Sequence, residues 1–210
     1  MNRTPNPFDN HADDYDSWYD QNQALYELEL DAIRAILPPS TGGRRLEVGV
    51  GSGRFAGPLG FSDGIDPGEQ ILELAVAAGV AVQVGVAEAL PYEDDSFEVV
   101  GIFTAMEFFT DPAAALREIR RVLAPGGALV ISYLNPNSAT GQTIEATKTD
   151  DRYYAGATFR TPEQISALLA EAGFGVQEQL QIRVDPNQPP IIRPGNIDEL
   201  FCVLRAAVLS

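Results

Sequence analysis

Short apolar runs alternate with helical patterns along this chain, and this alternation constrains the fold more than any other feature. Seven runs have the length and composition of strands, at residues 45–50, 60–66, 80–84, 97–104, 128–134, 175–184 and 199–208. Helical spacing of apolar residues is found before Pro38-Pro39, at 68–78, after Asp111-Pro112 and from Thr161 to Gly173. The run 97–104 is apolar on both faces, as in a parallel strand covered by helices on both sides.

This order of elements predicts an α/β fold with a Rossmann-like, doubly wound and mostly parallel sheet of seven strands. The last two runs follow each other without a helix between them, so we expect an antiparallel C-terminal hairpin across the proline-rich loop. Thr161-Pro162-Glu163-Gln164 has the pattern of a capping box. A chain of 210 residues has the usual size of one domain.

The charge and the reactive side chains exclude several classes of function. The chain has 30 Asp and Glu against 14 Lys and Arg, a net charge of −16 that repels nucleic acids and anionic membranes. It has one histidine, His11, and one cysteine, Cys202, so we expect neither a metal site nor a Ser/His/Asp triad. The polar amino terminus does not have the pattern of a signal peptide. We therefore expect a cytoplasmic protein whose partner is a small molecule, with no nucleic acid and no membrane.

Three glycines lie where the first strand turns into a helix. Gly49, Gly51 and Gly53 are two residues apart, and a turn without side chains lets the backbone approach a ligand. Glycine turns also connect strands to helices for packing reasons alone, and this is the alternative interpretation. Asp66 ends the second strand, where its carboxylate can accept hydrogen bonds from ribose hydroxyls or cap the helix that follows.

Four segments in this order resemble the class I S-adenosylmethionine-dependent methyltransferases. They are Glu47-Val48-Gly49-Val50-Gly51-Ser52-Gly53, Gly64-Ile65-Asp66-Pro67, the stretch 87–100 and the stretch 115–127. Their spacing is similar to that of the type 11 small-molecule methyltransferases. The resemblance implies an enzyme that uses S-adenosylmethionine as cofactor, releases S-adenosylhomocysteine and methylates a small molecule at N, O, S or C. The transfer would be an in-line displacement driven mainly by positioning.

The resemblance also implies roles for individual residues. Glu47, Gly49, Gly51 and Gly53 would hold the methionine part of the cofactor, Asp66 its ribose, and Pro67, Ala87 and Glu88 its adenine, while Thr104 would line the methyl side. Apart from the resemblance, the rings of Tyr15 and Trp18 in the amino-terminal segment would surround the sulfonium charge or, alternatively, serve only the packing of a lid. The family often has an aspartate at the position of Val86, where it accepts from the adenine amino group. Here Glu88 or a backbone carbonyl would replace it, or the affinity for the cofactor would be lower.

We expect a single methyltransferase domain over residues 1–210. It would comprise an N-terminal lid and helix (1–40), a cofactor-binding core (44–134), a substrate-side loop (135–160) and a C-terminal helix and hairpin (161–210). No residue is identified as catalytic. A general base is optional for this chemistry; Glu107 is the first candidate, followed by His11 or a tyrosine. The alternative interpretation of Glu107 is a solvated residue at a strand end.

Two alternative functions are open at this point. The segment from Gly51 to Ala56 fits the looser G-x-G-x-x-A pattern of nicotinamide dinucleotide enzymes, although Glu47 would repel a pyrophosphate. A methyltransferase-fold protein could also bind S-adenosylmethionine without turnover, as a regulatory or complex partner. Val86 favours that alternative, whereas the intact Glu47 and Asp66 oppose it.

Overall fold

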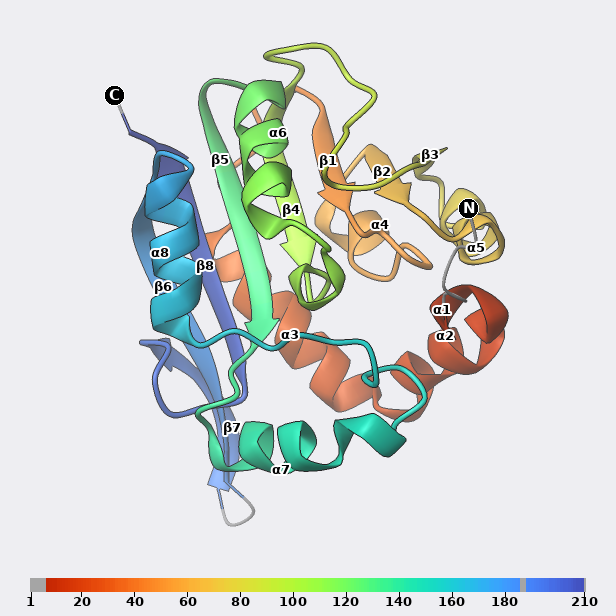
Figure 1. Cartoon of the computed structure of the whole chain (residues 1–210), viewed down its shortest axis with the longest axis vertical. Helices are drawn as coiled ribbons and strands as arrows, with labels where there is room; N and C mark the ends of the chain where they lie inside the picture. Colours follow the sequence, from red (N-terminus) through yellow and green to blue (C-terminus); the bar gives the residue numbers. More distant parts are fainter. Residues whose placement is uncertain (1–6, 186–187, 210) are drawn as a thin grey trace.

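The computed structural model describes residues 7–185 and 188–209, which form one mixed sheet with helices on both faces (Figure 1). The strands are β1 (Arg45–Val48), β2 (Asp63–Asp66), β3 (Ala81–Val84), β4 (Phe97–Phe103), β5 (Leu123–Leu134), β6 (Phe174–Asp185), β7 (Gln188–Pro194) and β8 (Phe201–Val208). Their order across the sheet is β3-β2-β1-β4-β5-β8-β6-β7. The first five strands of this order are parallel, and β8 pairs antiparallel with β5 and β6. The predicted α/β fold is confirmed.

The described residues contain one strand more than the seven expected. Gln188–Pro194 belongs to the segment expected to be a proline-rich loop, but it forms β7 and pairs antiparallel with β6 at the sheet edge. Proline has no backbone N–H, so it is tolerated on an edge strand, where no further strand requires that donor. The two runs expected to pair, β6 and β8, do so in antiparallel register.

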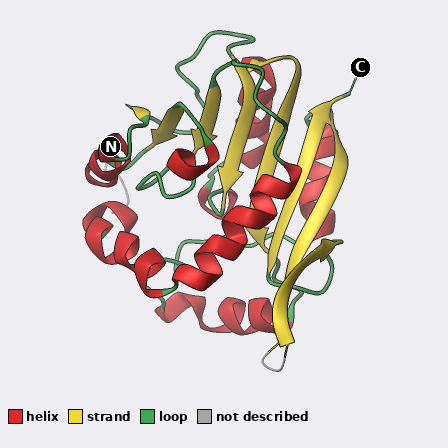
Figure 2. Cartoon of the chain, turned by 180° about the vertical axis from the view of Figure 1, so that it is seen from behind, coloured by secondary structure: helices red, strands yellow, loops and turns green. Residues whose placement is uncertain are grey.

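Helices cover both faces of the sheet, as the front and back views show (Figures 1 and 2). One face carries α6 (Pro112–Val122) and α8 (Pro162–Glu171), and the other carries α3 (Gln23–Ile36), α4 (Ala56–Leu59) and α5 (Glu69–Ala77). Asp111 caps α6 by accepting a hydrogen bond from the Ala114 N–H. The predicted capping box of α8 is confirmed, because the Thr161 and Gln164 side chains each accept from the other's backbone N–H.

Several short elements lie beyond the carboxyl ends of the parallel strands. They are α1 (Pro7–Asn10), α2 (Ala12–Gln21), the 3-10 helices η1 (Met106–Phe108) and η2 (Lys148–Asp150), and α7 (Ala139–Thr147). Helix α2 is acidic and buries only Tyr19, which explains why its sequence shows no clear apolar periodicity. Within 7–185 and 188–209 no helix has the length and apolar character needed to cross a membrane.

Candidate functional site

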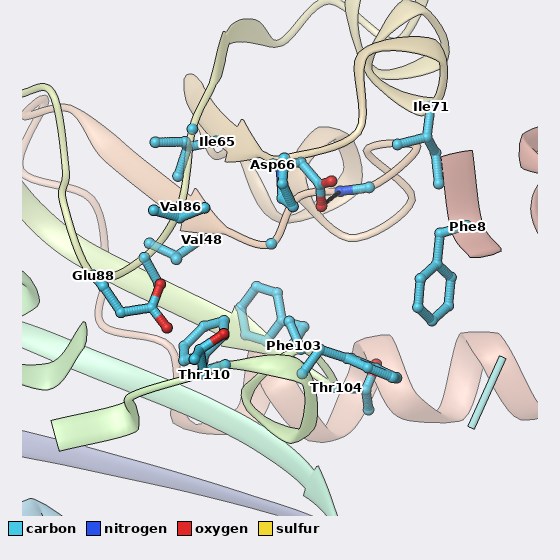
Figure 3. A pocket seen from close by; sticks show the side chains of 18 of the residues that line it. Phe8, Val48, Ile65, Asp66, Ile71, Val86, Glu88, Phe103, Thr104 and Thr110 are labelled. Atoms are coloured by element: carbon cyan, nitrogen blue, oxygen red, sulfur yellow. Dashed lines mark hydrogen bonds between the residues drawn. The ribbon is translucent and has the colours of Figure 1, made fainter. Parts of the chain in front are cut away.

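A cavity of about 390 Å³ opens at the carboxyl ends of β1, β2 and β4. The strand ends and the loops that follow them form most of its lining, and Phe8 and Tyr15 of the α1–α2 segment contribute the rest. Figure 3 shows Glu88 and Phe8 on opposite sides of the cavity, with Asp66 between them. This edge is where open α/β sheets bind their ligands.

The structure brings most of the predicted cofactor residues to this cavity. Eight of the eleven line it: Tyr15, Gly49, Gly51, Asp66, Pro67, Ala87, Glu88 and Thr104. Trp18, Glu47 and Gly53 are not among the lining residues. Trp18 is 42% exposed on α2, and its ring packs edge-on against Tyr19 rather than towards the cavity.

The glycine turn brings backbone against the cavity and against its neighbours. Gly49, Gly51 and Gly53 have φ values of 77°, 51° and 81°, a region that side chains disfavour. A Cβ on Gly49 would lie 2.5 Å from the Cβ of Ala105, and a Cβ on Gly53 would lie 3.0 Å from the Cα of Ala75 in α5. Close packing against α5 therefore explains why residue 53 is a glycine. Gly49 and Gly51 also line the cavity.

The Asp66 carboxylate is half-buried at the end of β2, and it is anchored by backbone donors. Its Oδ2 accepts from the Gly51 N–H at 3.2 Å and its Oδ1 accepts from the Gly68 N–H at 2.8 Å. Burial raises the pKa of this carboxyl to about 6, although both hydrogen bonds lower it. Asp66 thus orders the loop before α5 and also faces the cavity, so the two interpretations of its role are compatible.

The Glu47 carboxylate is buried, and one of its oxygens is left without a partner. Its side chain is 1% exposed in β1, and its Oε2 has no hydrogen-bond partner within the described part of the chain. Burial, together with the nearby Asp66 carboxylate, raises its pKa well above the ordinary value, although a backbone hydrogen bond from Ala56 lowers it. A buried carboxylate oxygen without a partner is costly and is suited to an ammonium group supplied by a ligand. Glu47 is not among the cavity-lining residues, but it directly precedes Val48 and Gly49, which are.

The loop after β3 forms an apolar wall with one carboxylate. Val86 lines the cavity where the family often has an aspartate, and its side chain remains 45% exposed. Glu88 also lines it, and its Oε1 accepts a hydrogen bond from the Asp111 N–H at 3.0 Å. One oxygen of Glu88 is thus held by the start of α6, which fixes the orientation of the group expected to replace the missing aspartate.

Phe8 is a cavity residue that the sequence analysis missed. Its ring packs against Tyr15, Phe108 and Tyr153, with centroids 4.9 to 5.3 Å apart. These rings come from α1, α2, η1 and the loop after η2, so they join the amino terminus to two loops at the carboxyl edge. The amino-terminal segment has no periodicity that could distinguish Phe8 from its neighbours.

Asp9 fastens this amino-terminal segment to the site. Its Oδ1 accepts from the Gln70 N–H at 2.6 Å and the Ile71 N–H at 3.1 Å, in the first turn of α5. Gly68, at the N-cap of α5, has no side chain to cap the helix. Asp9 therefore supplies that cap from a distant part of the chain.

We predict that Asp9→Ala removes this cap without unfolding the chain. A lost helix cap costs roughly 0.5 to 2 kcal/mol, which corresponds to about 2- to 30-fold faster amide exchange. Hydrogen exchange at Gln70 and Ile71, followed by mass spectrometry, measures this change. Asp13→Ala is the matched control, because the side chain of Asp13 is exposed and makes no hydrogen bond within the described residues. Equal exchange in both variants would contradict the capping role of Asp9.

Known proteins share this sequence pattern and this fold. Residues 46–131 match a family model described as "Methyltransferase domain". A crystal structure of an S-adenosylmethionine-dependent methyltransferase from Thermotoga maritima, described as a "possible histamine N-methyltransferase", is 32% identical with a TM-score of 0.89 and covers 96% of this chain and 97% of its own. An uncharacterised protein of Methanocaldococcus jannaschii is 34% identical over 169 residues, which are 80% of this chain and 81% of that protein. An uncharacterised Mycobacterium tuberculosis protein is 38% identical over 180 residues, and this chain spans 61% of its length.

Sheet order, glycine turn and cavity position together define a Rossmann-like methyltransferase fold. The identity and coverage of the relatives then fix the family: the chain belongs to the S-adenosylmethionine-dependent methyltransferases and is an enzyme of that class. The dinucleotide alternative is therefore set aside.

Proposed function

We propose that this protein transfers a methyl group from S-adenosylmethionine to a small-molecule acceptor and that the cavity binds the methyl donor. The observation that carries the proposal is the pair of carboxylates on neighbouring strands, Glu47 buried and Asp66 half-buried. Asp66 faces the cavity, and Glu47 has an oxygen without a partner in the described residues. The donor offers matching groups, ribose hydroxyls for Asp66 and an ammonium group for Glu47.

The remaining residues have complementary tasks in this proposal. Gly49 and Gly51 present backbone to the methionine part, and Val86 and Ala87 form an apolar wall for the adenine. S-adenosylmethionine supplies an activated methyl group on a positively charged sulfur. The chain itself would position the reactants and exclude water, a task for which the rings of Phe8 and Tyr15 are placed.

Calorimetric titration with S-adenosylmethionine and S-adenosylhomocysteine tests the proposed binding site. Asp66→Asn should weaken the binding of both ligands by roughly 1.5 to 3 kcal/mol, a loss of about 10- to 150-fold in affinity, because hydrogen bonds to a charged acceptor are lost. Glu73→Gln is the control, since Glu73 is exposed on α5. Absence of binding by the native protein would refute the proposed function. Unchanged affinity in Asp66→Asn would refute the role of Asp66.

The pH dependence of donor binding gives a second test of Asp66. The carboxyl has a pKa of about 6 in the ligand-free protein, and hydroxyl donors favour its ionised form. Affinity should therefore fall as the pH drops below 6, approaching about tenfold per pH unit. Asp66→Asn should abolish this pH dependence of the affinity, whereas Glu73→Gln should retain it. A native affinity that stays flat between pH 5 and pH 7 would contradict the assignment.

A further inference from the structure

The helices α1 and α2 lie beside the proposed donor site, but they bury little of their own surface. Phe8 and Tyr15 line the cavity, and Tyr19 is the one buried residue that the structure describes in these two helices. Figure 3 shows the ring of Phe8 at the edge of the cavity. Elements with few buried contacts open more readily than a core. The rate at which a ligand reaches the cavity should therefore depend on how firmly this segment is held.

Arg54 joins this segment to the glycine turn through a cluster of hydrogen bonds. It directly follows Gly53, and its guanidinium extends to α2. Its Nε and Nη2 donate to the Asp16 carboxylate at 2.7 and 2.6 Å, and its Nη1 and Nη2 donate to the Asp20 carboxylate at 2.8 and 3.1 Å. Two-point pairing of an arginine with a carboxylate fixes the orientation of both groups.

The ion pair between Arg54 and Asp16 is partly shielded from solvent. The two side chains are 25% and 24% exposed. Arg152 and Asp14 form another ion pair between α2 and the rest of the chain, but their side chains are 54% and 69% exposed. Ion pairs in full contact with water contribute little to stability. Arg54 therefore holds α2 more firmly than Arg152 does.

Helical spacing carries this contact to the cavity. Asp16 and Asp20 lie four residues apart on α2, and Tyr15 and Tyr19 repeat that spacing one residue earlier along the helix. The hydroxyls of Tyr15 and Tyr19 lie 2.8 Å apart, and the Arg54 guanidinium lies 5.8 Å from the centre of the Tyr19 ring. Because Tyr15 lines the cavity, Arg54 fixes the position of a cavity wall that it does not itself form.

The surfaces on which α1 and α2 rest are fixed to the sheet and its helices. Tyr26 of α3 donates a hydrogen bond to the Arg54 carbonyl. Phe8 packs on η1, where Glu107 is 4% exposed and its Oε1 accepts from the Leu134 N–H at the end of β5 at 3.1 Å. The interpretation of Glu107 as a solvated residue is therefore wrong. A movement that opens the cavity would thus be a movement of α1 and α2.

We infer that Arg54 is a positioning residue that latches α2 over the cavity and sets how fast the methyl donor and its product enter and leave. This inference rests on the proposed function. Arg54, Asp16 and Asp20 are not among the cavity-lining residues, so their contacts stabilise the closed position equally with and without a ligand. Loss of the latch should raise the association and dissociation rate constants by a similar factor and leave the dissociation constant nearly unchanged.

The binding kinetics of S-adenosylhomocysteine test this inference, measured with radiolabelled ligand by rapid filtration after mixing and after dilution into unlabelled ligand. Arg54→Gln should raise both rate constants by roughly 5- to 50-fold, between the effects typical of exposed and of buried charged hydrogen bonds. The dissociation constant should change by less than about threefold, because both rates rise together. Arg54→Lys, which keeps the charge but loses the two-point pairing, should lie between Arg54→Gln and the native protein.

A double-mutant cycle shows whether Arg54 acts through α2. Asp16→Asn should accelerate both steps as Arg54→Gln does, and the double variant should add little, because the two substitutions break the same contact. A direct contact between Arg54 and the ligand would instead weaken binding in Arg54→Gln and leave Asp16→Asn unchanged. Arg193→Gln is the matched control, since Arg193 also pairs with two carboxylates, Asp198 and Glu199, but on β7 and the loop after it. Its rate constants should equal those of the native protein.

Hydrogen exchange separates failure of the latch from failure of the proposed function. Amides of α2 should exchange faster in Arg54→Gln and Asp16→Asn than in the native protein, whereas those of α8 should not change. Unchanged binding rates in both variants, or a loss of affinity as large as the rise in the dissociation rate, would overturn the latch. Absence of ligand binding by the native protein would overturn the proposed function, whatever the exchange of α2.

Discussion

Replacing Gly49 by alanine is expected to cost about 2 to 5 kcal/mol of unfolding free energy and to remove methyl-donor binding. Two effects add. The residue has φ 77°, which disfavours any Cβ, and the added Cβ would lie 2.5 Å from the Cβ of Ala105 at the end of β4. The strand ends must separate to relieve this contact, and the cavity lies between them.

Gly60→Ala separates the two effects. Gly60 has φ 73°, but no atom lies within 4 Å of its added Cβ, so its replacement should cost only about 1 to 2 kcal/mol and leave donor binding intact. Ala105→Gly combined with Gly49→Ala should recover the part of the loss that comes from the clash. Denaturant unfolding and calorimetric titration measure these effects. Equal losses in Gly49→Ala and Gly60→Ala would show that the close approach to Ala105 has no consequence.

Replacing Glu47 by glutamine should have opposite effects on stability and on binding. Burial raises the pKa of Glu47 well above 4.5, so the folded chain holds a proton that the unfolded chain releases. This destabilises the native state increasingly as the pH rises above the unfolded value. Glu47→Gln removes the cost, so its melting temperature should exceed that of the native protein at pH 8 and approach it at pH 4.

Donor binding should fall in the same Glu47→Gln variant. A hydrogen bond between charged partners contributes about 1.5 to 3 kcal/mol, so affinity should drop roughly 10- to 150-fold. Each kcal/mol of stability gained raises the melting temperature by about 2 to 4 °C in a chain of this size. Thermal unfolding at both pH values and calorimetry measure the two changes. Glu73→Gln should change neither, and a Glu47→Gln protein less stable at pH 8 would contradict the buried, unpaired state of Glu47.

The order of strands and helices could be predicted because each core element carries its own periodicity and its own termination signals. The capping box at Thr161 and the proline break after α3 are local signals, and both have the expected consequence. Strand β7 could not be predicted in this way. Its prolines indicate a loop unless the segment is known to lie at a sheet edge, and that position is a property of the whole sheet.

The cavity residues that follow strand ends could be predicted, because motif position determines where those residues lie. Phe8 could not, since its place depends on how α1 packs. The burial of Glu29 was not predicted, although the sequence carries a signal for it. Glu29 stands four residues after Leu25 and four before Ile33, on the apolar stripe of α3, where a carboxylate is unusual. Ser132, within an otherwise apolar strand, carries a similar signal.

A crystal structure with S-adenosylhomocysteine bound tests the central claim most directly. We predict that the adenosyl group occupies the cavity beside Val86 and Ala87, that its ribose hydroxyls donate to Asp66, and that its ammonium group donates to Glu47 Oε2. The space at Thr104 should remain open for the acceptor. A ligand bound elsewhere, or in the cavity with Glu47 still unpartnered, would contradict the account.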